Sequence, residues 1–445
     1  MLFVKKNNHI MLKIMNIIFV SLNEPTKELT LIGDELINDF LNAISGNSLP
    51  DTNGIVNIEE PLIYTADLKE NIENLVSKYK HIIPQIHRIK NDFFSHLEDN
   101  EQFFMLPQEQ FNQKIELEVR EYLIAIKEGK SLETVKNDFE SYMGEIFNSY
   151  QIFSYGGNKK TYIGEPDKSK RVCRYCGGSK SNGYTEFKKI GHTISEALGN
   201  KNIITNDECD QCNWKFGTQI EQDLINLFSP LNTIFSIKGK NGVPHTKGIN
   251  FEIAKEGNNF HMKYYLSEEE KMPEFDGSHF DIYNKLASKV TFQNCYKALV
   301  KYAIGVLPSE FLNSMGKTIE WLNKEDLDEI ALPLIAIRQH IDSFVTHPII
   351  SVYIRKTEDF SLPYAVGEFR YTMFKIVFIV PFTNNSSCNF TNQAEYEHFW
   401  STFKLYSSLD SWKFVDWSSR RLNLINYHFH FSPQIEGESN NVEFV

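Results

Sequence analysis

Four of the six cysteines stand in two CxxC pairs, Cys173 with Cys176 and Cys209 with Cys212. Two such pairs, separated by about thirty residues, can supply four thiolates in a tetrahedron around Zn²⁺. Four cysteines fill the coordination shell, so the pattern predicts a structural zinc with no position left for a substrate. A disulfide framework is not expected, because such frameworks belong to short secreted chains rich in cysteine.

The segment between the two pairs carries a histidine at the end of a basic stretch, Phe187 to His192. An imidazole titrates near neutrality, so His192 could accept a proton from water at cellular pH. That property makes it the candidate general base of a hydrolytic reaction.

The combined pattern is CxxCG, a basic strand ending in His192, SEALGNK, an asparagine, CxxCN and FG. It resembles the HNH endonucleases, in the subgroup whose active site is flanked by CxxC pairs, and the resemblance covers roughly residues 170–228. It implies a zinc-stapled ββα-metal module in which His192 is the general base. It also implies that Asn206 ties the connecting loop and orients the histidine, and that Asn213 binds the catalytic Mg²⁺ or Mn²⁺.

Two positions depart from the family pattern. Gly191 stands where many members carry an acidic residue or a histidine as a second metal ligand, and Glu196 or Glu208 could take that place. Ser195 stands where proline is common. A catalytically inactive zinc module that binds DNA or protein is therefore the alternative to an active nuclease, and a third reading places an unrelated function in residues 240–445.

The charge of the chain is unevenly distributed. The net charge is -12, yet residues 168–190 hold seven basic side chains against one acidic one. A local basic patch beside the candidate base is what attraction to phosphates predicts. The expected nucleic-acid contacts are Lys170, Arg171, Arg174, Lys180, Lys188 and Lys189. Tyr175 and Tyr184 could stack on bases or pack inside the module.

Apolar periodicity and composition divide the chain into four parts of an α+β protein. A mostly helical domain is expected over residues 1–153, with a helix at 28–44 and a buried strand or helix at Ile14–Leu22. Residues 154–169 have linker composition, and residues 170–230 form the HNH module. An α+β domain is expected over 240–445, with helices at 279–304 and 317–343 and strands at 346–356, 364–382 and 423–431.

The chain is expected to be cytoplasmic, because its N-terminal apolar stretch is too short to span a bilayer and no small-residue cleavage site follows it. Nucleic acid is the expected substrate, with DNA favoured over RNA and no membrane partner. The acidity outside the basic patch suggests that the flanking domains restrain the nuclease until a regulatory protein partner, a homo-oligomer or a particular nucleic-acid structure relieves them. The alternative is that the acidity only keeps the protein soluble. By analogy alone, large HNH proteins of this kind resemble bacterial and phage nucleases, including mobile-element and anti-phage defence effectors.

Overall fold

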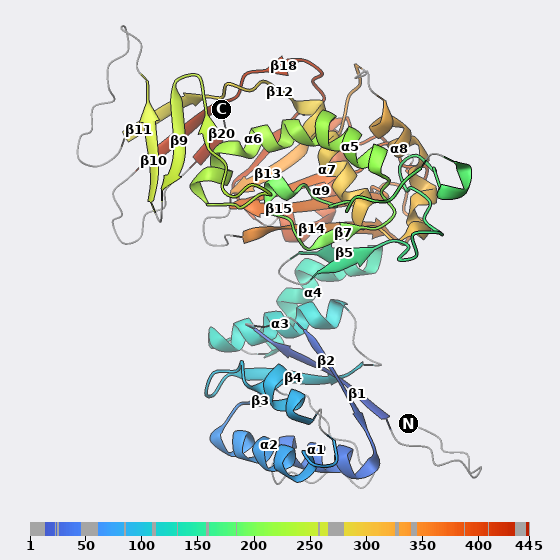
Figure 1. Cartoon of the computed structure of the whole chain (residues 1–445), viewed down its shortest axis with the longest axis vertical. Coiled ribbons are helices and arrows are strands. Elements are labelled where there is room, and N and C mark those ends of the chain that lie inside the picture. Colours follow the sequence, from blue (N-terminus) through green and yellow to red (C-terminus); the bar gives the residue numbers. More distant parts are fainter. Residues whose placement is uncertain are drawn as a thin grey trace. The chain divides into compact units, whose positions relative to one another are not determined.

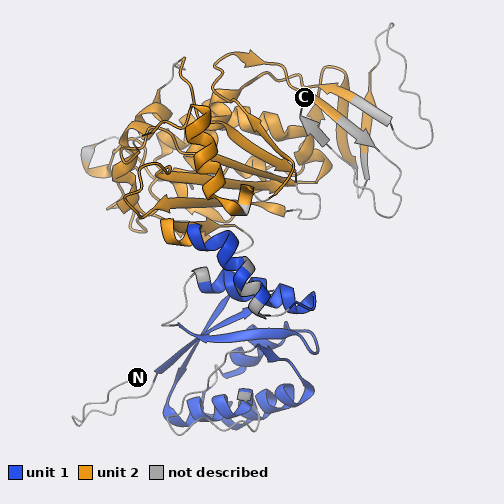
Figure 2. Ribbon diagram, turned by 180° about the vertical axis from the view of Figure 1, so that it is seen from behind, with its two compact units in different colours: residues 1–145 blue, residues 146–445 orange. Residues whose placement is uncertain are grey.

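The architecture is taken from a computed structural model of the chain (Figure 1). The structure describes residues 14–444, apart from positions 23, 25, 46–60, 84–85, 109–112, 131, 157–159, 184, 257–258, 266–279, 325–328, 340–344, 387, 408 and 432–441. The chain divides into two compact units, residues 1–145 and residues 146–445 (Figure 2). No helix in the described ranges is long and apolar enough to cross a membrane.

The first unit contains a four-stranded sheet in the order β2-β1-β4-β3. The strands are β1 (Ile14–Ser21), β2 (Lys27–Ile32), β3 (Leu62–Ile63) and β4 (Gln102–Pro107), and the helices are α1 (Asp34–Ser45), α2 (Ala66–Tyr79), the π-helix η2 (Ile89–Phe94) and α3 (Gln113–Lys127). A further helix, α4 (Leu132–Ser149), begins in this unit and ends in the second. Alternate residues of β1 enter two different cores: Ile17 and Phe19 pack with α1 and α2, whereas Ile18 and Val20 pack with α3. The sheet therefore has helices on both faces.

The described part of the N-terminal unit contains the expected helices and also a four-stranded sheet that was not predicted. Residues 28–44 were expected to form one helix, but Lys27–Ile32 is a strand and the helix begins at Asp34. In this strand Leu29 and Leu31 are buried while their neighbours are not, which is the period of two that a strand requires. The apolar residues of this segment fit both periods over a short window, and pairing with β1 decides between them.

The second unit is organised around a six-stranded antiparallel sheet in the order β17-β13-β16-β15-β14-β5. Its strands are β5 (Tyr150–Tyr155), β13 (Ile335–Gln339), β14 (Val345–Arg355), β15 (Ala365–Thr372), β16 (Phe374–Ile379) and β17 (Trp412–Val415). The strands predicted at 346–356 and 364–382 are confirmed, the second as the hairpin of β15 and β16. The helix α7 (Phe292–Val306) is buried along almost its whole length, and its buried residues include the polar side chains Gln293, Lys297 and Lys301.

Smaller elements complete the second unit. One three-stranded sheet contains β8 (Thr246–Lys247), β9 (Phe251–Glu256) and β10 (Asn259–Tyr264), and another contains β11 (Phe280–Lys285), β19 (Asn426–Phe431) and β20 (Val442–Phe444). A two-stranded sheet pairs β12 (Val290–Thr291) with β18 (Leu422–Asn423). The remaining helices are η6 (Ser309–Met315), α8 (Gly316–Asn323), α9 (Gln393–Thr402) and α10 (Lys404–Ser407). The helices expected at 279–304 and 317–343 are shorter than predicted, because strands β11 and β13 occupy parts of those ranges.

The cysteine-containing segment is built into this second unit. It contains β6 (Thr161–Ile163), η4 (Lys180–Asn182), η5 (Glu196–Leu198), β7 (Ile203–Thr205), α5 (Asp210–Gln219) and α6 (Glu221–Ile234). Its buried side chains belong to the same hydrophobic core as α7 and the large sheet. The structure therefore does not separate the expected module at 170–230 from the expected domain at 240–445, and the expected linker at 154–169 contributes β6 and the end of β5.

Candidate active site and zinc cluster

The two CxxC pairs meet in space. The Sγ atoms of Cys173, Cys176, Cys209 and Cys212 all lie within 4.8 Å of one another, and those of Cys176 and Cys209 are 3.7 Å apart. Four sulfurs at about 2.3 Å from a tetrahedral Zn²⁺ would be about 3.8 Å apart, so the cluster is consistent with a structural zinc. Within the described ranges it is the one group of three or more His, Cys and acidic side chains close enough to share an ion.

Local backbone geometry brings the thiols together. Gly177 has a φ of 69°, which suits glycine, and its N–H donates to the carbonyl of Cys173 at 2.8 Å. Cys209 caps the N-terminus of α5, where its sulfur accepts from the N–H of Cys212 at 3.4 Å. The N–H of Cys209 in turn donates to the sulfur of Cys173 at 3.4 Å. Backbone donors directed at sulfur favour the thiolates that a zinc ion requires.

The strand-like segment around His192 pairs antiparallel with β7. His192 is opposite Ile204, the Thr193 N–H donates to Ile203 at 3.1 Å, and the Thr205 N–H donates to Gly191 at 2.8 Å. The helix α5 follows β7 after a short turn, which gives the predicted ββα arrangement around the cysteine cluster. We refer to residues 191–193 together with β7 as the His192 ribbon.

The imidazole of His192 is partly exposed, with 19% of its side-chain surface accessible, and its Nε2 lies 3.7 Å from Oε2 of Glu196. Its Nδ1 is buried and has no hydrogen-bond partner among the described residues. Burial lowers the pKa of His192; the Glu196 carboxylate opposes this effect, and the positive charges of Lys301 and Lys160 add to it. A lowered pKa keeps the imidazole neutral near pH 7, in the form that can accept a proton.

Asn213 lies in the first turns of α5 and is partly exposed. Its Nδ2 donates to the carbonyl of Ile190 at 3.4 Å, which connects α5 to the chain just before the His192 ribbon. Its amide oxygen is a hard donor of the kind that Mg²⁺ or Mn²⁺ prefers. The structure thus brings Asn213 to the same end of the ββα arrangement as the residues preceding His192.

The side chain of Asn200 ties the loop that connects residues 191–193 to β7, and the role expected of Asn206 stays a prediction. Asn200 is buried, and its Nδ2 donates to the carbonyls of Ile194 and Ile203 at 2.8 and 3.0 Å. Its Oδ1 accepts from the N–H groups of Asn202 and Ile203. The backbone N–H of Asn206 instead donates to the carbonyl of Ile163 in β6. Asn200 lies inside the SEALGNK stretch, which was the sequence signal available for it.

Packing explains the glycine at position 191. A Cβ there would lie 2.9 Å from the carbonyl oxygen of Thr205 and 3.1 Å from the Cβ of Glu208. An acidic ligand at this position would therefore require the ribbon backbone to shift. Glu208 does not replace it in an open site, because its side chain is fully buried and its carboxylate lies 3.3 Å from Nζ of Lys301.

The predicted nucleic-acid contacts fall into two groups. Four lysines are exposed: Lys170, Lys180, Lys188 and Lys189. Arg171 and Arg174 are buried instead. The guanidinium of Arg171 donates to the carbonyls of residues 165 and 166.

Arg174 forms the most extensive of these internal contacts. It donates to both carboxylate oxygens of Asp207, at 2.8 and 3.1 Å, and to three carbonyls at the end of α7, those of Ile304, Gly305 and Leu307. Its side chain has no accessible surface. Arg174 therefore holds the first CxxC pair on α7, and a phosphate cannot reach its guanidinium.

The aromatic residues are also distributed differently from expectation. Tyr175 is buried and packs edge-on against Phe216, so it has a packing role, and Tyr184 lies outside the described residues. Tyr162 in β6 is 58% exposed and pairs with Ile204, the residue that is opposite His192. Lys160 lies over the Tyr162 ring, 5.6 Å from its centroid. The sequence did not predict this pair, because residues 154–169 have the composition of a linker.

Comparison with known proteins agrees with this geometry. A family model described as HNH endonuclease matches residues 173–229. These residues are an HNH endonuclease domain with a four-cysteine cluster, and the resemblance drawn from the sequence is confirmed. No curated protein and no solved structure matches the chain. The match ends within α6, so α7 and the large sheet lie outside the recognised domain.

Proposed function

We propose that this protein is an endonuclease that hydrolyses phosphodiester bonds of nucleic acid, DNA in preference to RNA, with His192 as the general base. The observation that carries the proposal is the environment of His192. It lies on the antiparallel ribbon of an HNH domain, it is partly open to solvent, and burial lowers the pKa of its imidazole. Such a group can take the proton from a water that attacks phosphorus.

Asn213 is the residue proposed to hold a catalytic Mg²⁺ or Mn²⁺. Its amide oxygen fits such an ion, and, apart from the four cysteines, the described ranges hold no group of three His, Cys or acidic side chains that could do so. An ion at Asn213 would therefore draw most of its remaining ligands from water and phosphate oxygens. When bound, it would polarise the phosphate and stabilise the leaving oxygen.

The substrate surface proposed for nucleic acid consists of exposed groups only. Lys170, Lys180, Lys188 and Lys189 supply positive charge for phosphates. Tyr162 and Lys160 add an exposed ring and a cation two strands away from His192, where a base could stack and a neighbouring phosphate be neutralised. A regulatory protein partner or a homo-oligomer stays a prediction.

A catalytically inactive module that binds nucleic acid is the second candidate, and the packing around Gly191 favours it, because no second ligand can stand there without a backbone shift. A plasmid-cleavage assay separates the two. The full chain is incubated with Mg²⁺, Mn²⁺ or EDTA, as wild type, His192→Ala and His245→Ala. His245 is the matched control, because it is a more exposed histidine that also faces a glutamate, at 2.7 Å.

The proposal expects metal-dependent cleavage by the wild type and by His245→Ala. His192→Ala should cut about 10²–10⁴-fold more slowly, as loss of a general base does. It should keep its zinc, because the imidazole is not one of the four zinc ligands, and its melting temperature shows that it is folded at the assay temperature. Wild-type protein that binds DNA without cutting it under any metal condition would establish the inactive module instead.

A further inference from the structure

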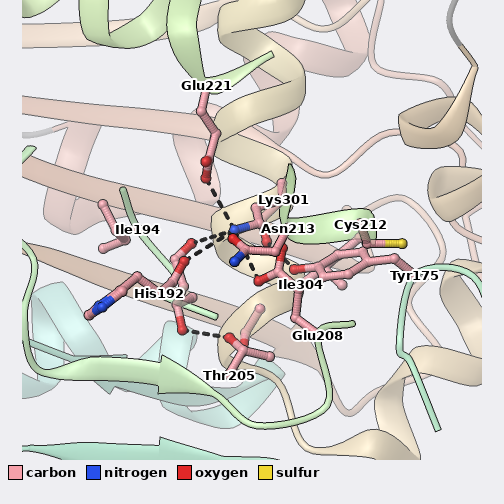
Figure 3. A network of polar contacts seen from close by, with 12 residues as sticks. Tyr175, His192, Ile194, Thr205, Glu208, Cys212, Asn213, Glu221, Lys301 and Ile304 are labelled. Atoms are coloured by element: carbon pink, nitrogen blue, oxygen red, sulfur yellow. Dashed lines mark hydrogen bonds and ion pairs between the residues drawn. The ribbon is translucent and has the colours of Figure 1, made fainter. Parts of the chain in front are cut away.

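The helix α7 carries a lysine whose ammonium group is enclosed by the HNH domain. Lys301 has no accessible side-chain surface. Its Nζ lies 3.1 Å from Glu221 and 3.3 Å from Glu208, and it also donates to the backbone carbonyls of Thr193, at 3.1 Å, and His192, at 3.3 Å (Figure 3). A lysine is almost never fully buried unless its charge is paired, and these acceptors provide the pairing for Lys301.

The four acceptors of the Lys301 ammonium have two different roles. The two carboxylates compensate its charge in a buried site. The two carbonyls belong to consecutive residues of the His192 ribbon, and in Figure 3 the backbone of His192 lies toward Lys301 while its imidazole extends away. The ammonium group donates hydrogen bonds to both carbonyls. These bonds restrict where this part of the ribbon can lie.

Other contacts from α7 reach the same ribbon. The hydroxyl of Thr205 donates to the carbonyl of Gly305 at 3.1 Å, and the hydroxyls of Thr193 and Thr205 are 2.6 Å apart. Gly305 is closely packed against the ribbon, because a Cβ there would lie 2.6 Å from Cγ2 of Thr193. The surface of α7 thus packs closely against the ribbon, and the Lys301 ammonium adds charged hydrogen bonds to the ribbon backbone.

We propose that Lys301 is a positioning residue of the nuclease, which fixes the backbone of His192 from a helix outside the recognised HNH domain. The inference rests on the proposed function, with His192 as the general base. A catalytic group displaced by about 1 Å can lose about 10² in rate, so a fixed ribbon contributes directly to turnover. The active centre would then extend over residues 173–229 and α7 together.

Lys301→Met is the variant that tests this, in the full chain. Lys297→Met is the matched control, because Lys297 lies one turn earlier on α7, is also buried, and donates to the carbonyl of Lys324 at 3.0 Å, away from the ribbon.

Two readouts are taken at a temperature where every variant is folded. One is plasmid cleavage, separated into kcat and KM, and the other is amide hydrogen exchange in residues 190–206. Lys301→Met should lower kcat by about 10–100-fold with little change in KM, because the exposed lysines that bind substrate are untouched. The same variant should speed exchange of the Thr193 and Thr205 amides, whereas Lys297→Met should not.

The inference is overturned if Lys297→Met lowers kcat as much as Lys301→Met does, because the effect would then be one of general stability. It is also overturned if exchange in the ribbon is unchanged in Lys301→Met. If that variant does not fold, Lys301→Gln replaces it, because its side chain is one bond shorter and cannot reach both carbonyls at their present distances. The same loss of kcat and faster exchange are then expected. If the wild type does not cut at all, the proposed function fails, and hydrogen exchange alone decides whether Lys301 holds the ribbon.

Discussion

Arg174 provides the sharpest test of how the HNH domain is attached to the rest of its unit. The sequence suggested that its guanidinium binds phosphate, but the structure encloses it between Asp207 and the carbonyl end of α7. Two variants separate these views. Arg174→Met removes the charge, and Arg174→Lys keeps the charge but loses the planar fork that contacts both oxygens of the carboxylate.

The expected magnitudes follow from the contacts. Arg174→Met leaves Asp207 buried and unpaired, with 8% of its side chain exposed, and breaking a buried pair from one side costs about 3–5 kcal/mol. Arg174→Lys replaces five donor hydrogens by three, so at least two hydrogen bonds are lost and the free energy of unfolding should fall by about 1–3 kcal/mol. Against a total stability of about 5–15 kcal/mol, both losses are measurable.

Urea unfolding of the full chain measures these losses, with Lys170→Met as the control, because 72% of the Lys170 side chain is exposed. We expect Lys170→Met to weaken DNA binding at low salt and to leave the unfolding free energy unchanged. Arg174→Lys should lower the unfolding free energy and leave DNA binding unchanged, provided that binding is measured on folded protein. The reasoning fails if Arg174→Lys is as stable as the wild type, or if it weakens DNA binding as much as Lys170→Met without affecting unfolding.

Other predictions concern the zinc cluster, the loop and the base. Cys212→Ser should abolish zinc retention by elemental analysis and unfold the HNH domain, because a structural zinc contributes on the order of 10 kcal/mol in small metal-binding domains. Asn200→Ala should lower the unfolding free energy by about 1–3 kcal/mol, since it leaves buried backbone groups unpaired, whereas Asn206→Ala should change it little; equal losses would contradict the loop assignment. Cleavage should fall with decreasing pH as His192 becomes protonated, with a midpoint below the ordinary histidine pKa because burial lowers it. The Glu196 carboxylate raises that pKa, so Glu196→Gln should move the midpoint to lower pH, and a shift to higher pH would refute the assignment.

The HNH domain and its four-cysteine cluster could be predicted from the sequence because their signals are local. A CxxC pair forms one knuckle within a few residues, so the spacing of Cys173, Cys176, Cys209 and Cys212 was sufficient to predict the four-cysteine cluster. His192 is likewise defined by its place between the two pairs. The long apolar strands β14 and β15 could also be predicted, because their patterns are unambiguous over many residues.

What holds these residues in place was decided only by the tertiary structure. Arg174 and Lys301 are ordinary basic residues in the sequence, and their acceptors lie up to 133 positions away along the chain. A buried charge is determined by partners that become neighbours only after folding, so no local pattern distinguishes it from an exposed one. The same reason explains why Tyr162 was not predicted as a contact residue. Its segment has the composition of a linker, and only the pairing of β6 with β7 places it near His192.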